Sequence, residues 1–425
     1  MAEEERSFRA PKGTNDLLPP DSIAWQGLMR VAMDTFGRAG YQPVETPIFE
    51  HTEVFERGVG VASEVVGKQM YTFIDRGDRS LTLRPEGTAP VVRAVLEHGL
   101  QRGALPLKLA YAGPMFRQER PQKGRYRQFW QVGIEALGSD TPAVDAEVIE
   151  VGMRFLTDSG VSPELSLNSI GHPDPSCREG YLELLRSFLR ERAADLAEDD
   201  RARVDTNPLR TFDSKERATV AVMREAPAIT EHLCSDCATH FGEVRALLDR
   251  IGVAYRLEPK LVRGLDYYTR TTFEFVSGGL GSQDAVGGGG RYDGLAESLG
   301  GDPLPGIGFA LGVDRILLAA ESARGAPATA APSRVAVYIV AIGTDAAADA
   351  LVLATELRRS GIGADLDLAA RSMKGQMKQA SASGARWAAI LGERERDAGT
   401  VTLKDLSSSD QREIPQDDLI EAVRA

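Results

Sequence analysis

Cysteine is scarce in this chain of 425 residues, which contains only Cys177, Cys234 and Cys237. A small, odd number of cysteines excludes a framework of disulfides. Long apolar runs are also missing, because none approaches the ~18 residues of a membrane span. The first residues, MAEEERSF, are acidic and lack the apolar region of a secretory signal. We therefore expect a soluble, cytoplasmic protein without a membrane segment.

Positive charge is outnumbered by negative charge. The 50 Lys and Arg residues and the 62 Asp and Glu residues give a net charge of −12. This balance excludes a protein that coats nucleic acid by bulk charge, so any such contact must use a local basic patch. The hydrophobic content of 42% is ordinary for a globular protein, and the length suggests two or three domains.

Two common nucleotide-binding fingerprints are absent. No G-x-x-x-x-G-K-[ST] occurs, and Gly306, Gly308 and Gly312 do not have the glycine spacing of a dinucleotide site. We therefore expect neither a P-loop enzyme nor a Rossmann enzyme. A further glycine run, Gly287–Gly290 before Arg291, is equally compatible with a flexible turn and with a binding site.

The segment from Gln128 to Leu137 has two contrasting faces when it is read with the period of two of a strand. One face is apolar or small, with Trp130, Val132, Ile134 and Ala136. The other face carries Phe129, Gln131, Gly133 and Glu135. Because a buried carboxylate without a partner is costly, the second face predicts the floor of a binding site.

A basic loop precedes this strand. Between residues 117 and 127 one acid, Glu119, stands among five basic residues: Arg117, Arg120, Lys123, Arg125 and Arg127. In an acidic chain this local excess suggests a phosphorylated ligand, held beside a smaller cationic or polar one. An exposed charged hairpin over an ordinary sheet is the alternative.

Periodicity and breakers predict the elements near the N-terminus. A helix runs from about Ile23 to Ala39 and is ended by Gly40. The prolines Pro43 and Pro47 in the next extended segment indicate an edge or interface strand. A short strand at 81–84 and a helix capped by Thr88 follow.

A helical insertion is expected from about residue 171 to 255, where charged amphipathic helix replaces the strand pattern. It contains His232, Cys234, Cys237 and His240, and the C-x-x-C spacing is that of half a zinc site. These residues fall on what reads as one helix, and no second ligand pair is evident in the sequence. We therefore expect polar helix surface and no metal in the protein.

A domain boundary is expected near the end of the first three quarters of the chain. The segment 306–318, GIGFALGVDRILL, predicts a helix that starts at glycines. An Ala/Pro/Ser-rich linker at 326–333 then separates a domain at 1–325 from one at 334–425. Strands and helices alternate beyond the linker, which predicts a small, largely parallel sheet.

Taken together, the motifs resemble those of the histidyl-tRNA synthetase family, in order and spacing, over essentially the whole chain. The segments that carry the resemblance are KGTNDLLPP, LRPEGTA, MFRQERPQKGRYRQFWQVGIE, LVRGLDYYTR, GGGGRYDGL and GIGFALGVDRILL. The resemblance implies an α+β fold: a class II synthetase antiparallel sheet flanked by helices, with a helical insertion and a C-terminal α/β anticodon-binding domain. It also implies a homodimer built on the Pro47 segment and the helix before it.

The resemblance implies an enzyme that activates L-histidine with ATP, accompanied by Mg²⁺, and transfers it to tRNA(His). On the ATP side, Arg117 would grip the α-phosphate and Arg315 would lie along the nucleotide. Phe129 would stack on adenine, and Glu119 would lie near its amino group. A guanidinium suits phosphate because its fork binds two oxygens.

The same resemblance assigns the histidine side and the tRNA side. Around the α-amino group and the imidazole it implies Glu86, Thr88, Gln131, Glu135, Tyr267, Tyr268 and Tyr292. Arg263 would lie between the substrate carboxylate and the α-phosphate. Arg120 and Gln122 would approach the acceptor end of the tRNA. Arg371, Lys374 and Lys378 are spaced to share one helix face of the anticodon domain.

Four alternatives are considered at this stage. Tyr267 and Thr88 could be packing and capping residues, and the basic helix face could be solvated surface. The chain could also resemble the histidine-sensing regulatory subunit of ATP phosphoribosyltransferase, which keeps the fold without charging tRNA. Against that paralogue stand the anticodon domain and the arginines Arg117, Arg263 and Arg315. A class II synthetase for another amino acid conflicts with LVRGLDYY and with Glu135.

Overall fold

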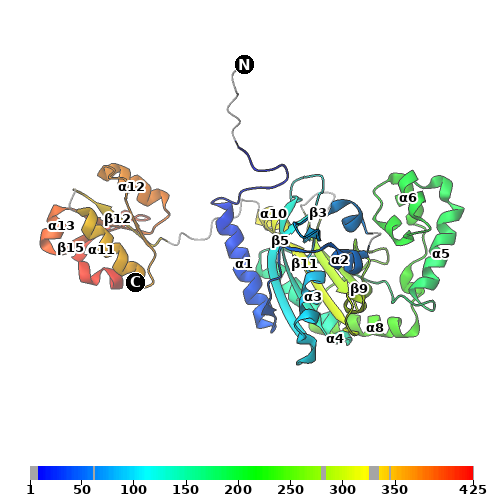
Figure 1. Ribbon diagram of the computed structural model, residues 1–425. Coiled ribbons are helices and arrows are strands. Elements are labelled where there is room, and N and C mark those ends of the chain that lie inside the picture. The colour runs from blue at the N-terminus through cyan, green and yellow to red at the C-terminus, as the bar shows by residue number, and fades with distance from the viewer. Residues whose placement is uncertain (1–7, 61–62, 279–283, 325–334, 344–345, 425) are drawn as a thin grey trace, which may run out of the picture. The chain divides into compact units, whose positions relative to one another are not determined.

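The computed structural model describes residues 8–60, 63–278, 284–324, 335–343 and 346–424. The chain divides into two compact units, Met1–Thr329 and Ala330–Ala425 (Figure 1). The predicted linker at 326–333 lies outside the described residues, so the predicted domain limits stay a prediction. No helix in the described part of the chain is both long and apolar enough to cross a membrane.

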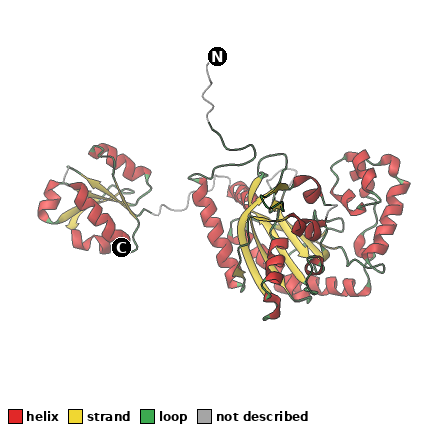
Figure 2. Ribbon diagram, in the orientation of Figure 1, coloured by secondary structure: helices red, strands yellow, loops and turns green. Residues whose placement is uncertain are grey.

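An eight-stranded sheet forms the centre of the first unit (Figure 2). Its pairings are antiparallel except for two short parallel pairs, one at each edge. In spatial order the strands are β1 (Gln42–Pro43), β5 (Leu107–Phe116), β6 (Gln128–Leu137), β11 (Gly306–Gly312), β10 (Ala285–Arg291), β9 (Thr269–Val276), β7 (Glu164–Ser169) and β8 (Arg256–Leu257). The expected antiparallel sheet is confirmed, and β6 has the predicted bounds.

Helices cover one face of this sheet, and the apolar face of β6 packs beneath them. Val132, Ile134 and Ala136 are fully buried in the main core. The covering helices are α1 (Asp21–Arg38), α4 (Pro142–Asp158), α8 (Ser235–Ile251) and α10 (Val313–Arg324). The other face of β6 is therefore left for the polar side chains, as the alternation predicts.

The opposite side of the sheet carries smaller elements. They are α2 (Thr52–Phe55), α3 (Thr88–Glu97), α9 (Leu295–Ser298) and a three-stranded sheet of β2 (Phe49–His51), β4 (Ser80–Leu83) and β3 (Tyr71–Ile74). The valines of α3 pack with Tyr111 and Tyr292 in a second core cluster. The start of α3 therefore faces the polar side of β6.

Several local predictions are confirmed, one open alternative is decided and one prediction is wrong. The first helix ends as expected before Gly40, whose φ of +84° suits glycine, and Pro43 lies in the edge strand β1. The run Gly287–Gly290 is not a turn, because it lies inside strand β10. The segment 306–312 is not the start of a helix but strand β11, and α10 begins at Val313.

The helical insertion has its own small core. Its helices are α5 (Arg178–Glu191), α6 (Glu198–Arg203) and α7 (Arg217–Met223), joined by 3-10 turns. Tyr181, Leu185 and Leu189 of α5 form the centre of that core. In contrast, α8 lies within the predicted insertion but sends Phe241 and Val244 into the main core.

The second unit is a five-stranded sheet with helices. Its strands, in spatial order, are β13 (Ala364–Leu366), β12 (Val337–Ala341), β14 (Trp387–Leu391), β15 (Thr400–Asp405) and β16 (Gln411–Pro415). The pairings of β12 with β13 and with β14 are parallel, and the pairings β14–β15 and β15–β16 are antiparallel. The helices are α11 (Ala346–Arg359), α12 (Met373–Ala382), α13 (Glu393–Ala398) and α14 (Leu419–Arg424). The predicted strand–helix alternation is confirmed, although α13 and β16 were not foreseen because both are short and exposed.

Candidate active site

Glu135 of β6 is the centre of a buried polar network. The Thr88 hydroxyl donates to its Oε1 at 2.7 Å, and the Tyr292 hydroxyl donates to its Oε2. The side chain is fully buried, and this burial raises the pKa of Glu135 to about 8 although both hydrogen bonds act to lower it. The carboxyl is thus held rigidly and can exchange a proton near neutral pH.

The start of α3 supplies two more site residues. Glu86 accepts the backbone N–H groups of Thr88 at 2.8 Å and Ala89 at 2.9 Å. Glu86 therefore caps the helix, and the prediction that Thr88 is the capping side chain is wrong. The hydroxyl of Thr88 is directed to Glu135 instead. Burial raises the pKa of Glu86 above its usual range, although these amide donors oppose the shift.

Three tyrosines join the charged groups. The ring of Tyr267 lies 4.7 Å from that of Tyr268 and 5.7 Å from that of Tyr292, measured between centroids. Its hydroxyl reaches Glu86 at 3.4 Å. Tyr268 is buried; burial raises its pKa, and the charge of Arg263 lowers it, so this guanidinium is close by. Glu86, Glu135 and Arg263 thus each lie beside one member of the tyrosine cluster.

Arg263 precedes β9 and is fixed by one strong contact. Its Nη1 donates to Glu274 of β9 at 2.7 Å, and its side chain is 19% exposed. The buried Nε has no hydrogen-bond partner among the described residues. A buried N–H without an acceptor costs free energy, so this nitrogen is suited to an anionic ligand.

Glycines keep this side of the sheet open. A Cβ on Gly308 would lie 1.9 Å from the Glu135 carboxylate, and one on Gly288 would lie 3.0 Å from Nη1 of Arg263. Gly133, between Gln131 and Glu135, leaves room for the ring of Tyr111, which would lie 2.4 Å from a Cβ there. Sequence reasoning missed Tyr111, because only the pairing of β5 with β6 brings it opposite Gly133.

The residues predicted for ATP gather at the β5–β6 hairpin. The guanidinium of Arg117 lies 5.4 Å from the ring centroid of Phe129, and its Nε donates to the carbonyl of Pro85 at 2.9 Å. Glu119 lies 3.8 Å from Arg117 and 3.4 Å from Arg125. Because Pro85 directly precedes Glu86, Arg117 connects the hairpin to the tyrosine cluster.

Gln131 lies between the two groups of residues on the same face of β6. Its Oε1 is buried and has no hydrogen-bond partner among the described residues. An acceptor in that state favours a donor on a ligand, such as an ammonium. Phe129, Gln131 and Glu135 therefore follow one another along the face that the period of two predicts.

Arg315 and the tip of the hairpin complete the predicted set. Arg315, in the first turn of α10, donates from Nε to the carbonyl of Ala285 at 2.6 Å, and burial lowers its pKa below the usual range. A Cβ on Gly124 would lie 3.7 Å from its Cγ, so the hairpin tip passes over this arginine. Arg120 and Gln122 are exposed on the same hairpin.

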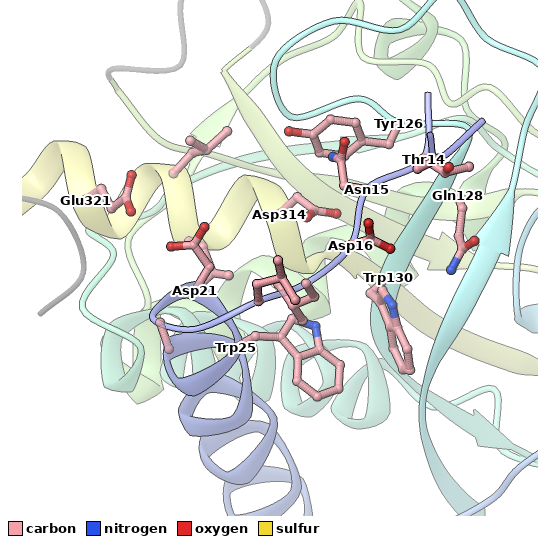
Figure 3. A pocket seen from close by; sticks show the side chains of 16 residues that line it. Thr14, Asn15, Asp16, Asp21, Trp25, Tyr126, Gln128, Trp130, Asp314 and Glu321 are labelled. Atoms are coloured by element: carbon pink, nitrogen blue, oxygen red, sulfur yellow. The ribbon is translucent and has the colours of Figure 1, made fainter. Parts of the chain in front are cut away.

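A separate hollow lies on the helix side of the sheet (Figure 3). Its volume is about 650 Å³, and it is lined by the segment before α1, by Gln128 and Trp130 of β6, and by α10. Trp25 and Trp130 meet there edge to face, 4.8 Å apart. None of the predicted site residues lines this hollow, because Trp130 points to the opposite face from Phe129 and Gln131.

The prediction of polar helix surface around Cys234 and Cys237 is wrong. Cys237 is 1% exposed, and the pair meets His172 and Cys177 from the loop after β7, with all four ligand atoms within 4.8 Å of one another. The expectation of no metal depended on the lack of a second ligand pair, and that premise fails. His232 and His240 are not part of the group.

The basic residues of the second unit do not share one helix face. Lys374 and Lys378 are exposed on α12, one turn apart. Arg371 precedes the helix and donates from Nη1 to Asp367 at 2.5 Å, so the predicted position is wrong for this residue. Arg371 instead lines a hollow of about 470 Å³ with Tyr338 and Gln379.

Both units match known proteins. A sequence model described as histidyl-tRNA synthetase matches residues 13–316, and one described as anticodon binding domain matches residues 336–425. The histidine–tRNA ligases of Rhodococcus erythropolis and Moorella thermoacetica are each 51% identical to this chain. These matches cover 98% and 95% of this chain, and 97% and 95% of the relatives.

A solved structure agrees with these sequence matches. The crystal structure of the apo histidyl-tRNA synthetase of S. aureus gives a TM-score of 0.82 at 37% sequence identity. The comparison covers 99% of this chain and 100% of that one. The similarity therefore includes the core sheet, the insertion and the second unit.

Proposed function

The chain belongs to the histidyl-tRNA synthetase family, and we propose how its residues carry out the reaction of that family. It is an ATP-dependent ligase that joins histidine to tRNA. A carboxylate oxygen of histidine attacks the α-phosphorus of ATP, the bond to the bridging oxygen breaks, and pyrophosphate leaves. The histidyl group of the adenylate then moves to the 3′ end of tRNA(His), releasing AMP.

The charges around the tyrosine cluster carry the proposal. Histidine has two basic groups and one acidic group, and the cluster brings together two buried carboxylates and one guanidinium: Glu86, Glu135 and Arg263. We assign Glu86, with Gln131, to the α-ammonium and Glu135 to the imidazole. Thr88 and Tyr292 orient Glu135, while Tyr267 and Tyr268 form the wall. Such a site rejects side chains that cannot satisfy its buried polar groups.

Arg263 and Arg117 stabilise the developing charge. As the carboxylate approaches the α-phosphate, two anions are forced together, and a guanidinium between them offsets their repulsion most in the transition state. The buried Nε of Arg263, which has no hydrogen-bond partner in the part of the chain that the structure describes, supports this role. Arg117 holds the α-phosphate, Phe129 stacks on adenine with Glu119 near its amino group, and Arg315 lies along the nucleotide.

Mg²⁺ enters with ATP. The acids closest to the arginines, Glu119 and Glu274, already pair with Arg125 and Arg263. No group of three carboxylates converges here in the described part of the chain. Magnesium commonly binds through substrate phosphates and few protein ligands, so we assign the ion to ATP and no protein cage to it.

The tRNA contacts are divided between the two units. The exposed Arg120 and Gln122 on the β5–β6 hairpin would meet the acceptor end. Lys374 and Lys378 would meet anticodon-loop phosphates, and Arg371 would line the hollow next to them. Lysine and arginine side chains position a nucleic acid through its phosphates.

We also propose a cytoplasmic homodimer. Apolar side chains are exposed on the three-stranded sheet and next to it, with Phe49 at 51%, Phe73 at 43% and Ile74 at 62% exposure. The rings of Phe49 and Phe73 lie 6.4 Å apart. An exposed apolar patch of this kind marks an interaction surface, and the nearby Pro47 segment is the one that builds the dimer in the family.

Amino-acid-dependent exchange of pyrophosphate into ATP tests the proposal. Exchange should require histidine, and the other amino acids should support little or none. Equal exchange with a second amino acid would contradict the assignment of Glu135. Histidine binding without any exchange would instead favour the regulatory-subunit alternative.

A further inference from the structure

The four residues at the base of the insertion are arranged like the ligands of a metal. Nδ1 of His172 lies 3.0 Å from Sγ of Cys237 and 3.8 Å from Sγ of Cys234. All four ligand atoms, including Sγ of Cys177, lie within 4.8 Å of one another. Tetrahedral zinc with Zn–S bonds of about 2.3 Å places sulfur ligands about 3.8 Å apart. The cluster therefore needs only small side-chain movements to surround one ion.

The backbone around the cluster favours thiolates. Cys177 and Cys234 occupy the N-cap positions of α5 and α8, where the helix dipole stabilises negative charge. The backbone N–H of Cys234 donates to Sγ of Cys177 at 3.4 Å, and that of Cys237 donates to Sγ of Cys234 at 3.5 Å. These donors offset the charge of deprotonated sulfurs before any ion binds.

The loop that carries the first two ligands is tightly shaped. Gly171 has a φ of +63°, and a Cβ there would lie 2.7 Å from Sγ of Cys177. Backbone N–H groups of Asp174 and Cys177 donate to the carbonyls of His172 and Asp174, both at 2.9 Å. The turn thus places His172 and Cys177 side by side, and a larger residue at position 171 would separate them.

We propose that His172, Cys177, Cys234 and Cys237 bind one structural zinc ion. Three thiolates and one imidazole are the donors of a closed zinc site, whereas magnesium and calcium prefer oxygen ligands. The ion connects the point where the chain enters the insertion, at Cys177, to the point where it returns, at Cys234. It therefore fixes the insertion to the core at its base.

The loop that carries His172 and Cys177 also contacts the segment that leads into β9. Arg178, the residue after Cys177, donates from Nη1 to the carbonyl of Tyr268 at 2.6 Å. The backbone of Gly171 accepts from Arg270 at 2.8 Å. The loop after β7 thus supports the segment that leads into β9, where Tyr268 lies.

Metal content of the full chain tests the proposal. Protein purified in zinc-containing buffer should hold about one zinc per chain by elemental analysis. Replacing zinc with cobalt(II) should produce the intense visible bands of a tetrahedral, thiolate-bound ion. A metal-free, natively folded chain that does not bind added zinc would overturn the proposal, as would a disulfide that removes two of the three thiols.

Matched histidine variants identify the ligands. His172→Gln should weaken zinc affinity at least about tenfold in competition with a chelator, since even outer-sphere changes cost about 10–100-fold. His232→Gln is the control, because His232 is exposed two residues before Cys234, lies outside the cluster, and has its ring centroid 5.9 Å from that of Tyr181. Equal affinity in the two variants would exclude His172 as a ligand.

A structural readout does not depend on activity. Removing zinc from the wild-type chain should lower its unfolding temperature and speed hydrogen exchange at the start of α5 and at the amide of Arg270, which donates to Gly171. Cys237→Ser should show the lower temperature without a chelator. If a chelator changes neither the unfolding temperature nor the hydrogen exchange of the wild-type chain, the structural role is contradicted. This holds whatever the pyrophosphate exchange assay with histidine shows.

Discussion

Glu135 shows how one side chain depends on distant parts of the chain. Thr88 comes 47 residues before it and Tyr292 comes 157 residues after it, yet both donate to the same carboxylate. Gly308 on the neighbouring strand leaves the space that the carboxylate fills. Burial disfavours the charged form and raises the pKa of Glu135 to about 8.

The stability of the chain should therefore depend on the proton of Glu135. Its pKa is raised from 4.5 in the unfolded chain to about 8 in the folded one, so the folded state holds the proton more tightly. Its contribution is complete below about pH 4.5 and is lost as the pH rises to about 8, with a slope of up to about 1.4 kcal/mol per pH unit.

Urea unfolding at several pH values checks this dependence. Glu135→Gln mimics the protonated form and does not titrate, so the stability of the wild type relative to this variant should fall between pH 5 and pH 8. Glu183→Gln, at a side chain that is 70% exposed, is the control and should follow the wild type. A constant difference between wild type and Glu135→Gln would show that Glu135 is ionised throughout.

Arg263 gives a kinetic prediction at the same scale. Arg263→Ala should slow adenylate formation about 10²–10³-fold, the usual effect of one preorganised donor, while the dissociation constant for histidine changes little. Arg263→Lys should recover only part of the rate, since an ammonium lacks the planar fork. Single-turnover adenylate formation, measured beside direct histidine binding, decides this.

Glu274 provides the comparison for that experiment. It holds Nη1 of Arg263 at 2.7 Å and has no proposed contact with substrate. Glu274→Gln should therefore slow adenylate formation less than Arg263→Ala does. If Arg263→Ala activates histidine at the normal rate, the arginine is structural and the proposed mechanism is wrong.

At the scale of elements, the β5–β6 hairpin and the three-stranded sheet differ in which of their apolar side chains are covered. The β5–β6 hairpin combines an apolar face against the helices with a polar face toward the ligands, so one strand serves both core and site. The three-stranded sheet β2–β4–β3 instead exposes apolar rings. An exposed apolar patch of this kind marks an interaction surface, and the proposed dimer would use it.

Phe49→Asp should therefore weaken the proposed dimer. A charge at this half-exposed ring would have to be buried without a partner in the interface, so we expect a shift toward monomer of tenfold or more in dissociation constant. Light scattering over a range of protein concentrations measures it. Leu368→Asp, at an 83% exposed position of the second unit, should leave the mass unchanged.

At the scale of the whole molecule, the proposed assignments place histidine activation in the first unit and the anticodon contacts in the second. Arg117, Arg263 and Arg315 lie in the first, and Lys374 and Lys378 lie in the second. Each unit has its own apolar core. The proposed reaction needs both units only when tRNA is present.

A chain that ends at Thr329 should therefore separate the two steps. If it keeps the circular dichroism expected of the first unit, it should form histidyl-adenylate at close to the normal rate and charge tRNA at least tenfold more slowly. Pyrophosphate exchange and aminoacylation assays measure the two steps. Unchanged charging would mean that the second unit has a role other than tRNA binding.

The sequence by itself determined the local features. The alternation in β6 separates core from site because successive side chains of any strand point to opposite faces. The ordered motifs identified the family and the predicted site residues. Gly40 and Pro43 marked a helix end and an edge strand because their backbones allow few alternatives there.

Only the tertiary structure decided which distant residues meet. In the folded chain Thr88 donates to Glu135, and Glu86 caps the helix. Two glycine runs form strands whose neighbours leave no space for a Cβ. The fold also joined His172 and Cys177 to a C-x-x-C pair about 60 residues away. Such contacts depend on how helices and strands pack, and sequence periodicity describes one element at a time.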